Sequence, residues 1–339
     1  FPSLDHDKNR CKKENCGQTY CDKENFCKEK TTVIPISQET RKKCINNSMK
    51  RQHRKALISF SAFFLVLFTT TFCPDYPSVI IFHTVYPGWQ EEHGNLKIVF
   101  FSDLHLRNTT IENGYPRKLI DCINKLQPDL VLILGDIFDR SQHGRIRELK
   151  EPFVKIFSQL KSRYGIFAIL GNHDVYCGKR IITELCEAAG IRMLDGNLAT
   201  PVINGKPLFL YGIREYDDKR VTLLKIPEWE KRKINTLKTP LILSHRSDVF
   251  FDLDEKRPFL VLSGHTHGGL IRLPFLAGGV YDLIPNTERQ QTYKKYIYGH
   301  YQQKNKQLYV TGGLDGSFHH LRVNCPPEII VMTIKPEIK

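Results

Sequence analysis

The feature that most constrains the fold of this chain is a short apolar run that ends in a polar cluster and recurs five times. The runs occupy residues 96–101, 130–134, 166–170, 241–243 and 259–262. Short apolar runs bounded in this way are typical of buried strands. Residues 116–126 and 148–160 have the apolar spacing of helices, and residues 208–213, 307–310 and 329–333 resemble further strands. This alternation predicts an α/β fold with mixed sheets.

The polar clusters place potential metal ligands directly after the predicted strands. In open α/β sheets, ligand sites lie beyond the carboxyl ends of the strands. A single aspartate or asparagine there is a common turn residue, but all five runs end in this way, which favours one shared pocket. The candidate ligands are Asp103, His105, Asp136, Asn172, His245, His265 and His267.

These candidate ligands combine carboxylates, imidazoles and one amide, and they include no cysteine. That mixture is unlike a structural zinc site and suits Mn²⁺, Fe or Zn²⁺ in a catalytic site with open positions. Seven side chains exceed the needs of one ion, so we expect two divalent metal ions that share a carboxylate, with Mn²⁺ favoured. Two such ions stabilise both the attacking and the leaving oxygen of a phosphoryl displacement.

Five motifs in the chain resemble those of the calcineurin-like metallophosphoesterases. They are Asp-x-His at 103–105, Gly-Asp-x-x-Asp at 135–139, Gly-Asn-His-Asp at 171–174, the lone His245 and Gly-His-x-His at 264–267. All five are intact and in order, and the resemblance extends over residues 96–335. It implies a four-layer α/β/β/α sandwich of two mixed sheets with a dinuclear metal centre.

The resemblance also implies a role for each matching side chain. The first metal would be held by Asp103, His105 and His267, the second by Asn172, His245 and His265, and Asp136 would bridge the two. His173 would not bind metal but would protonate the leaving group or stabilise the phosphoryl oxygens. Asp174 would orient His173, and Asp139 would support the ligands of the first metal.

The finer motif pattern resembles a membrane-associated bacterial branch of the family, which includes a UDP-2,3-diacylglucosamine diphosphatase of lipid A biosynthesis. The pattern comprises residues 101–105, 171–174, 244–248 and 264–269, followed by Leu273 and Pro274. It implies cleavage of a pyrophosphate to UMP and 2,3-diacylglucosamine 1-phosphate. Leu270 differs from this branch, because many of its members carry a polar residue at that position. The difference affects the pocket that is expected to bind the leaving group.

The choice of phosphoester stays open at this point. The alternatives are a phosphodiesterase or phosphatase acting on another phospholipid or nucleotide, and a metal-free scaffold. Four basic residues are candidates for binding a second phosphate: Arg107, Lys179, Arg246 and Arg272. The apolar loop at 270–277 would either contact lipid or lie in the core. The tyrosines of residues 281–301 would form either an interfacial flap or an ordinary strand hairpin.

The charge of the chain limits the classes of partner that we expect, and its cysteines indicate the compartment. The net charge of +14 favours phosphorylated ligands or an anionic membrane surface. We find no nucleic-acid-binding motif and expect no nucleic-acid partner. Five of the ten cysteines lie within the first 44 residues and the others are scattered. That scatter predicts reduced thiols that face the cytosol rather than a disulfide framework.

The first 92 residues predict two segments ahead of a catalytic domain at 93–339. Residues 1–48 are polar and lysine-rich, and three interpretations compete: a disordered basic tail, a small metal-binding knuckle, or translated sequence upstream of the true start. We favour the last, because the basic stretch from Met49, followed by an apolar run, resembles a bacterial amino terminus.

Residues 56–72 are seventeen residues without a charge, close to the length of about 20 that a spanning helix needs. A spanning helix, an interfacial hairpin and a buried core helix are alternatives for this segment within the predicted region 49–92. A spanning helix would place the catalytic domain outside, whereas a hairpin would leave it inside. We expect association with the bacterial inner membrane and a catalytic domain that faces the cytoplasm.

Overall fold

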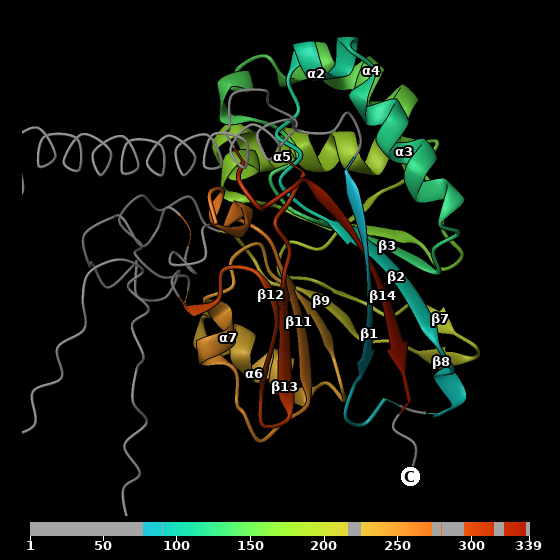
Figure 1. Ribbon diagram of the computed structural model, residues 1–339. Coiled ribbons are helices and arrows are strands. Elements are labelled where there is room, and N and C mark those ends of the chain that lie inside the picture. Colours follow the sequence, from blue (N-terminus) through green and yellow to red (C-terminus); the bar gives the residue numbers. More distant parts are fainter. Residues whose placement is uncertain are drawn as a thin grey trace, which may run out of the picture. The chain divides into compact units, whose positions relative to one another are not determined.

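The computed structural model describes residues 77–89, 91–215, 225–272, 279, 295–314 and 322–336. These residues form two six-stranded mixed sheets and a small two-stranded sheet (Figure 1). The predicted tail at 1–48, the apolar segment at 56–72 and parts of the stretches at 270–277 and 281–301 lie outside the described residues. The predicted α/β class with two mixed sheets is confirmed.

The first sheet has the strand order β1-β14-β2-β3-β4-β5. Its strands are β1 (Ser78–Val85), β14 (Glu328–Lys335), β2 (Leu96–Phe101), β3 (Leu130–Leu134), β4 (Ile166–Ile169) and β5 (Arg192–Met193). The pair β14–β2 is antiparallel and the other pairs are parallel. The connecting helices are α2 (Asn108–Glu112), α3 (Tyr115–Lys125), α4 (Lys150–Phe157) and α5 (Asn172–Ala188), with 3-10 turns η1 (Glu91–His93), η2 (Arg140–Gln142) and η3 (Ile146–Leu149).

The second sheet has the strand order β12-β13-β11-β10-β9-β6. Its strands are β12 (Gly299–Gln303), β13 (Lys306–Val310), β11 (Phe259–Ser263), β10 (Leu241–Leu243), β9 (Leu210–Gly212) and β6 (Leu198–Ala199). The two outer pairs are antiparallel and the inner pairs are parallel. The remaining elements are α6 (Glu228–Thr236), α7 (Val249–Asp252), the 3-10 turn η4 (His267–Gly269) and the hairpin of β7 (Val202–Ile203) and β8 (Lys206–Pro207).

Three apolar layers hold these elements together. One lies between the first sheet and helices α3, α4 and α5, where Val131 and Ile133 face Phe153. A second lies between the two sheets, and a third lies between the second sheet and helices α6 and α7. Figure 1 shows the helices on the outer side of each sheet. Because both faces of the central strands are covered, every residue of β3 is buried.

Strand β1 corrects the predicted segment boundary. Residues 79–82 were expected to extend the membrane-associating region 49–92, yet β1 pairs in parallel with β14 along all eight of its residues. The sheet of the catalytic domain therefore begins before residue 93. Ile81 on this edge strand is 68% exposed. In the part of the chain that the structure describes, we find no helix with the length and hydrophobicity that crossing a membrane requires.

Candidate metal centre

The strand ends of both sheets meet at the predicted ligands. Strands β2, β3 and β4 of the first sheet lead into Asp103, Asp136 and Asn172, and His105 follows Asp103. Strands β10 and β11 of the second sheet lead into the three remaining histidines, His245, His265 and His267. Three groups of these side chains bring their ligand atoms within 4.8 Å of one another.

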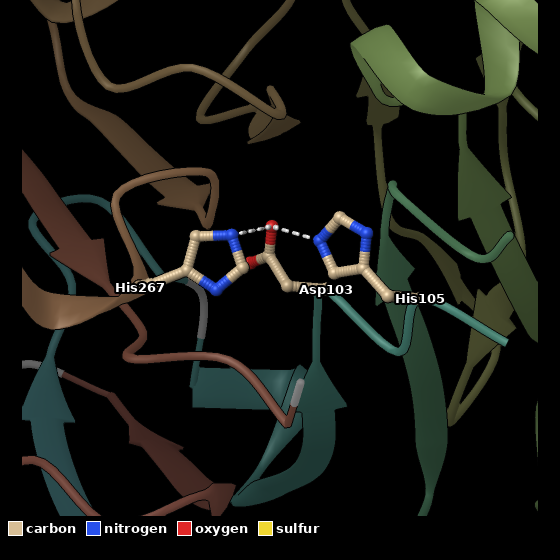
Figure 2. Close-up of side chains that lie close together, drawn as sticks. All are labelled: Asp103, His105 and His267. Carbon is tan, nitrogen blue, oxygen red and sulfur yellow. Dashed lines mark ion pairs between the residues drawn. The ribbon is translucent and has the colours of Figure 1, made fainter. Parts of the chain in front are cut away.

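The first group surrounds the carboxylate of Asp103. Its Oδ1 atom lies 3.9 Å from Nε2 of His105 and 3.7 Å from Nε2 of His267, and the two imidazoles flank it (Figure 2). The Oδ2 atom accepts hydrogen bonds from the backbone N–H of His265, at 3.0 Å, and from the hydroxyl of Ser102. One oxygen is thus anchored, and the other faces the histidines.

The other two groups share the carboxylate of Asp136. Its Oδ2 atom lies 3.7 Å from Nε2 of His105 and 3.3 Å from Nε2 of His245. Nδ1 of His265 lies 3.1 Å from the same His245 nitrogen. Asp136 therefore belongs both to a group with His105 and His173 and to a group with His245 and His265. A carboxylate in this position is suited to contact two cations at once.

Neighbouring groups orient two of the imidazoles. Nδ1 of His245 lies 2.8 Å from the carbonyl oxygen of Leu134, which accepts only, so Nδ1 donates and Nε2 is the nitrogen that faces the site. Burial lowers the pKa of His245, but the carboxylate of Asp136 outweighs burial and raises that pKa to about 10, so a cation would displace a proton from Nε2 on binding. Nδ1 of His105 lies 3.6 Å from Oδ2 of Asp139, and Arg107 donates to that oxygen at 2.9 Å. Asp139 therefore contacts a predicted ligand of the first metal and not the predicted metal position itself.

The backbone at the ligand residues adopts a conformation that side chains seldom take. Five of them have positive φ angles: Asp103 at 54°, His105 at 45°, Asp136 at 52°, His265 at 71° and His267 at 50°. Each such residue costs roughly 1–3 kcal/mol, and such residues gather at functional sites where the surrounding structure enforces them. The concentration of left-handed residues at one point marks this cluster as built for ligand binding rather than for stability.

The charge states of two predicted ligands also favour the binding of cations. Burial raises the pKa of Asp136, but the imidazoles of His245, His105 and His173 outweigh burial and hold it well below its usual range. Burial, followed by the charges of His245 and Arg246, holds the pKa of His265 well below its usual range, so that ring is neutral. Metal ligands must be deprotonated, and both groups meet that requirement.

Two buried oxygen atoms indicate that the predicted ligands fit a metal ion. Oδ1 of Asp103 and Oδ1 of Asn172 are buried and accept no hydrogen bond within the described residues. Buried acceptors without partners are rare and costly, by about 1–3 kcal/mol each. Both oxygens belong to predicted ligands, so the donor set fits divalent cations. Mn²⁺, Fe and Zn²⁺ all accept carboxylate and imidazole ligands of this kind.

His173 stands beside the ligands at the start of α5. Its ring makes an edge contact with His105, with centroids 4.5 Å apart, and its Nδ1 accepts the backbone N–H of Arg140 at 3.2 Å. Asp174 does not orient this ring as predicted. Its two carboxylate oxygens accept backbone N–H groups of Gly171, Ile137 and Phe138, so it holds together the loops that carry Asn172 and Asp136.

The four basic residues predicted to bind phosphate differ in their partners. Arg107 is paired with Asp139, as described above. Nζ of Lys179 donates to the carbonyl of Glu215 at 2.5 Å and lies 3.5 Å from Asp195. Arg246 is buried, with Nε 2.9 Å from the buried carboxylate of Glu215. Arg272, by contrast, stacks over the ring of Tyr298 at 4.4 Å. Carboxylates thus already neutralise three of the four.

Several residues that shape the centre were given no role in the sequence prediction. Ser102 donates to Asp103, and Gly264 and Gly313 pack so closely on Asp103 that a Cβ on either would overlap it or Ser102. Gly313 belongs to a glycine-rich cluster that directly follows a predicted strand, the same signal that marked the ligands. Applying that rule to the strand at 307–310 would have found it.

Comparison with known proteins agrees with the geometry. A model of the calcineurin-like phosphoesterases matches residues 96–304. An uncharacterised metallophosphoesterase of Campylobacter jejuni is 32% identical over 71% of this chain and 59% of its own length. The uncharacterised metallophosphoesterase YkuE of Bacillus subtilis is 30% identical over 72% of this chain and 81% of its own. The phosphodiesterase YaeI of Escherichia coli is 27% identical over 74% of this chain and 91% of its own.

The chain thus spans 59% of the length of its Campylobacter relative and most of the other two. The family match, which covers more than half of the chain, coincides with the residues whose aspartates and histidines converge. The chain therefore belongs to the calcineurin-like phosphoesterases.

Proposed function

We propose that this protein hydrolyses phosphodiester or pyrophosphate bonds at a centre of two divalent cations. The observation that carries the proposal is the sharing of Asp136 between two groups of histidines. The first cation would be held by Asp103, His105 and His267, the second by Asn172, His245 and His265, and Asp136 would contact both. The described residues supply these donors from both sheets.

When bound, the two cations would supply positive charge that polarises the phosphoryl group and activates water for attack. The chain's own contribution is orientation. The carbonyl of Leu134 fixes the tautomer of His245, and Ser102 together with the N–H of His265 anchors Asp103. Fixed dipoles and charges of this kind stabilise the charge that develops during phosphoryl transfer without reorganising first.

We propose that His173 acts on the phosphoryl group through a proton. Its Nδ1 accepts the N–H of Arg140, so the neutral ring carries its proton on Nε2. From that atom it would donate a hydrogen bond to a phosphoryl oxygen, or the proton itself to the leaving oxygen. His173 also lies near enough to His105 and Asp136 to join a metal-binding group. We propose the proton role because the Arg140 hydrogen bond fixes the ring.

The test is hydrolysis of bis-p-nitrophenyl phosphate by the purified full chain supplied with Mn²⁺. Asp136→Asn should remove activity by at least about a hundredfold, because one shared ligand serves both cations. The substitution should also lower the metal content of the purified protein, which elemental analysis measures. The matched control is Asp121→Asn, an exposed carboxylate on α3, which should leave both unchanged. Full activity in the Asp136 variant would contradict the proposal.

A narrower substrate is UDP-2,3-diacylglucosamine, cleaved to UMP and 2,3-diacylglucosamine 1-phosphate. It is supported by the motif pattern described above, by the apolar residues 56–72 and by the basic composition. The relative YaeI carries the broader description of a phosphodiesterase. Release of UMP from UDP-2,3-diacylglucosamine, compared with release of nucleotide from other nucleotide diphosphate esters, decides between the two. Equal rates on all substrates would count against the lipid proposal and leave the diesterase proposal intact.

A further inference from the structure

Arg322 is a buried charge for which the described residues supply no anionic partner. Its side chain is 4% exposed. Nη1 donates to the carbonyl oxygens of Gly312, at 2.9 Å, and Cys325, at 3.1 Å. Nε and Nη2 are buried and donate to nothing within the described residues. No carboxylate of the described chain lies within ion-pair distance of this guanidinium. A guanidinium taken out of water is costly unless an anion compensates it.

Glu328 is a carboxylate of the same region as Arg322, but other groups bind it. Glu328 accepts hydrogen bonds from the hydroxyl of Tyr298 at 2.7 Å, from the hydroxyl of Thr311 at 3.0 Å and from the N–H of Gly312 at 2.8 Å. These contacts occupy both of its oxygens. The compensating anion for Arg322 therefore has to come from outside the described residues of this chain.

The guanidinium is anchored on loops that touch the metal centre. Gly312, which accepts from Nη1, precedes Gly313, whose Cβ position would lie 2.8 Å from the Asp103 carboxylate. Cys325, the other acceptor, places its sulfur 3.2 Å from the carbonyl of His267. Arg322 is thus connected to Asp103 through Gly312 and Gly313, and to His267 through Cys325.

Arg272 adds a second positive charge to the same region. It stacks over Tyr298, and a Cβ on Gly312 would lie 3.3 Å from that ring. The N–H of Arg272 donates to the carbonyl of Val323, next to Arg322, at 2.8 Å. Within the described part of the chain, no acid lies within ion-pair distance of Arg272 either. Two guanidinium groups that have no carboxylate partner among the described residues therefore lie near Cys325, which contacts the backbone of His267.

We propose that Arg322, with Arg272, binds a second phosphoryl group that is linked to the one under attack. This proposal rests on the proposed hydrolase function. With Nη1 held by two carbonyls, the Nε–Nη2 edge of Arg322 is the edge left for a ligand. That edge donates two parallel hydrogen bonds, which match two oxygens of one phosphate. The substrate class is a diphosphate or an ester of one, rather than a simple monophosphate.

The test compares two probes that differ by one phosphoryl group. AMP and ADP would be measured as inhibitors of bis-p-nitrophenyl phosphate hydrolysis by the Mn²⁺-loaded full chain. Mn²⁺ would be kept in the same molar excess over each nucleotide. In the wild type, ADP should bind about tenfold or more tightly than AMP, the effect of one or two charge-assisted hydrogen bonds. Arg322→Met should bring the ratio of the two inhibition constants close to one, and Arg322→Lys should keep part of it.

The controls separate a structural role from a binding role. Arg163→Met replaces an arginine with a largely exposed side chain and should keep the wild-type ratio. If Arg322 only holds its loops together, Arg322→Met will weaken both probes equally or lower the metal content, and the proposal fails. It also fails if wild-type protein binds the two probes equally. If the methionine variant does not fold, Arg322→Lys and Arg272→Met carry the same test. Absence of any wild-type hydrolysis would instead overturn the proposed function.

Discussion

The ligand residues combine an unfavourable backbone with strongly constrained side chains. Asp103, His105 and Asp136 all have left-handed backbone conformations, and each is buried. The carboxylates of Asp103 and Asp136 accept backbone hydrogen bonds, from the N–H of His265 and the N–H of His173 respectively. The chain accepts this local cost because it fixes the donors before any cation or substrate arrives, and preorganised charge is the main source of catalysis in such centres.

His173 provides the sharpest prediction for a single residue. His173→Ala should keep the bound metal, because the predicted ligands remain, but should lower kcat by roughly a hundredfold to ten-thousandfold. The measurement is metal content by elemental analysis beside kcat on bis-p-nitrophenyl phosphate. A parallel fall in metal content and rate would mean that His173 is a ligand, a role that its position near His105 and Asp136 also allows.

At the scale of elements, the strands with two buried faces were predictable from the sequence. Strands β2 and β3 occupy the predicted residues, because a run covered on both sides is almost entirely apolar. Strand β1 was not recognised, since its residues alternate between exposed and partly buried at a sheet edge. Helix α5 was also missed. Its first turn carries the polar site motif, and Gly178 interrupts its backbone at φ 121°.

The same contrast holds for the centre. The convergence of the predicted ligands could be expected, because each lies in a cluster that follows a strand and the carboxyl ends of parallel strands meet. The partners that orient them could not. The contact of the Leu134 carbonyl with His245 and the place of Arg322 beside Gly312 depend on how distant segments pack. No local pattern in the sequence reports such contacts.

The turn between β4 and α5 offers a test of this packing. A Cβ at Gly171 would overlap the Asp136 carboxylate and its backbone nitrogen. Gly171→Ala should therefore destabilise the fold by about 1–3 kcal/mol and remove most activity, since Asp136 must move. Thermal unfolding and the bis-p-nitrophenyl phosphate assay measure the two effects.

Gly114 is the matched position for that comparison. A Cβ there meets nothing within 4 Å, although its φ of 76° is left-handed. Gly114→Ala should cost about 1–2 kcal/mol for the backbone alone and should leave the rate intact. Equal loss of activity in both variants would show that the crowding at Asp136 is not what matters.

At the scale of the molecule, the metal donors are divided between the two sheets. The first sheet contributes Asp103, His105, Asp136 and Asn172, and the second contributes His245, His265 and His267. Between the sheets lies an apolar layer. Bound cations would therefore join the two sheets at one end, where the layer stops and charged groups begin.

Removal of metal should lower the stability of the whole domain. Cations at about a hundred times their Kd add roughly 2.7 kcal/mol per site to the folded state. Dialysis against a chelator should thus lower the Tm by at least about 5 °C, and Mn²⁺ should restore it. Asp136→Asn should show a much smaller shift. An identical Tm with and without chelator in the wild type would indicate that the cations do not link the sheets.

The pairing of β1 with β14 has a consequence for how the protein is made. Ser78 pairs with Glu328 and Val85 with Lys335, so the partner that β1 has among the described strands lies near the end of the described chain. During synthesis, β1 leaves the ribosome long before β14 and stays unpaired until β14 has also emerged. Contacts between such distant segments form slowly, and an unpaired apolar edge invites aggregation meanwhile. Nascent chains halted before residue 328 should therefore depend on chaperones that shield this strand.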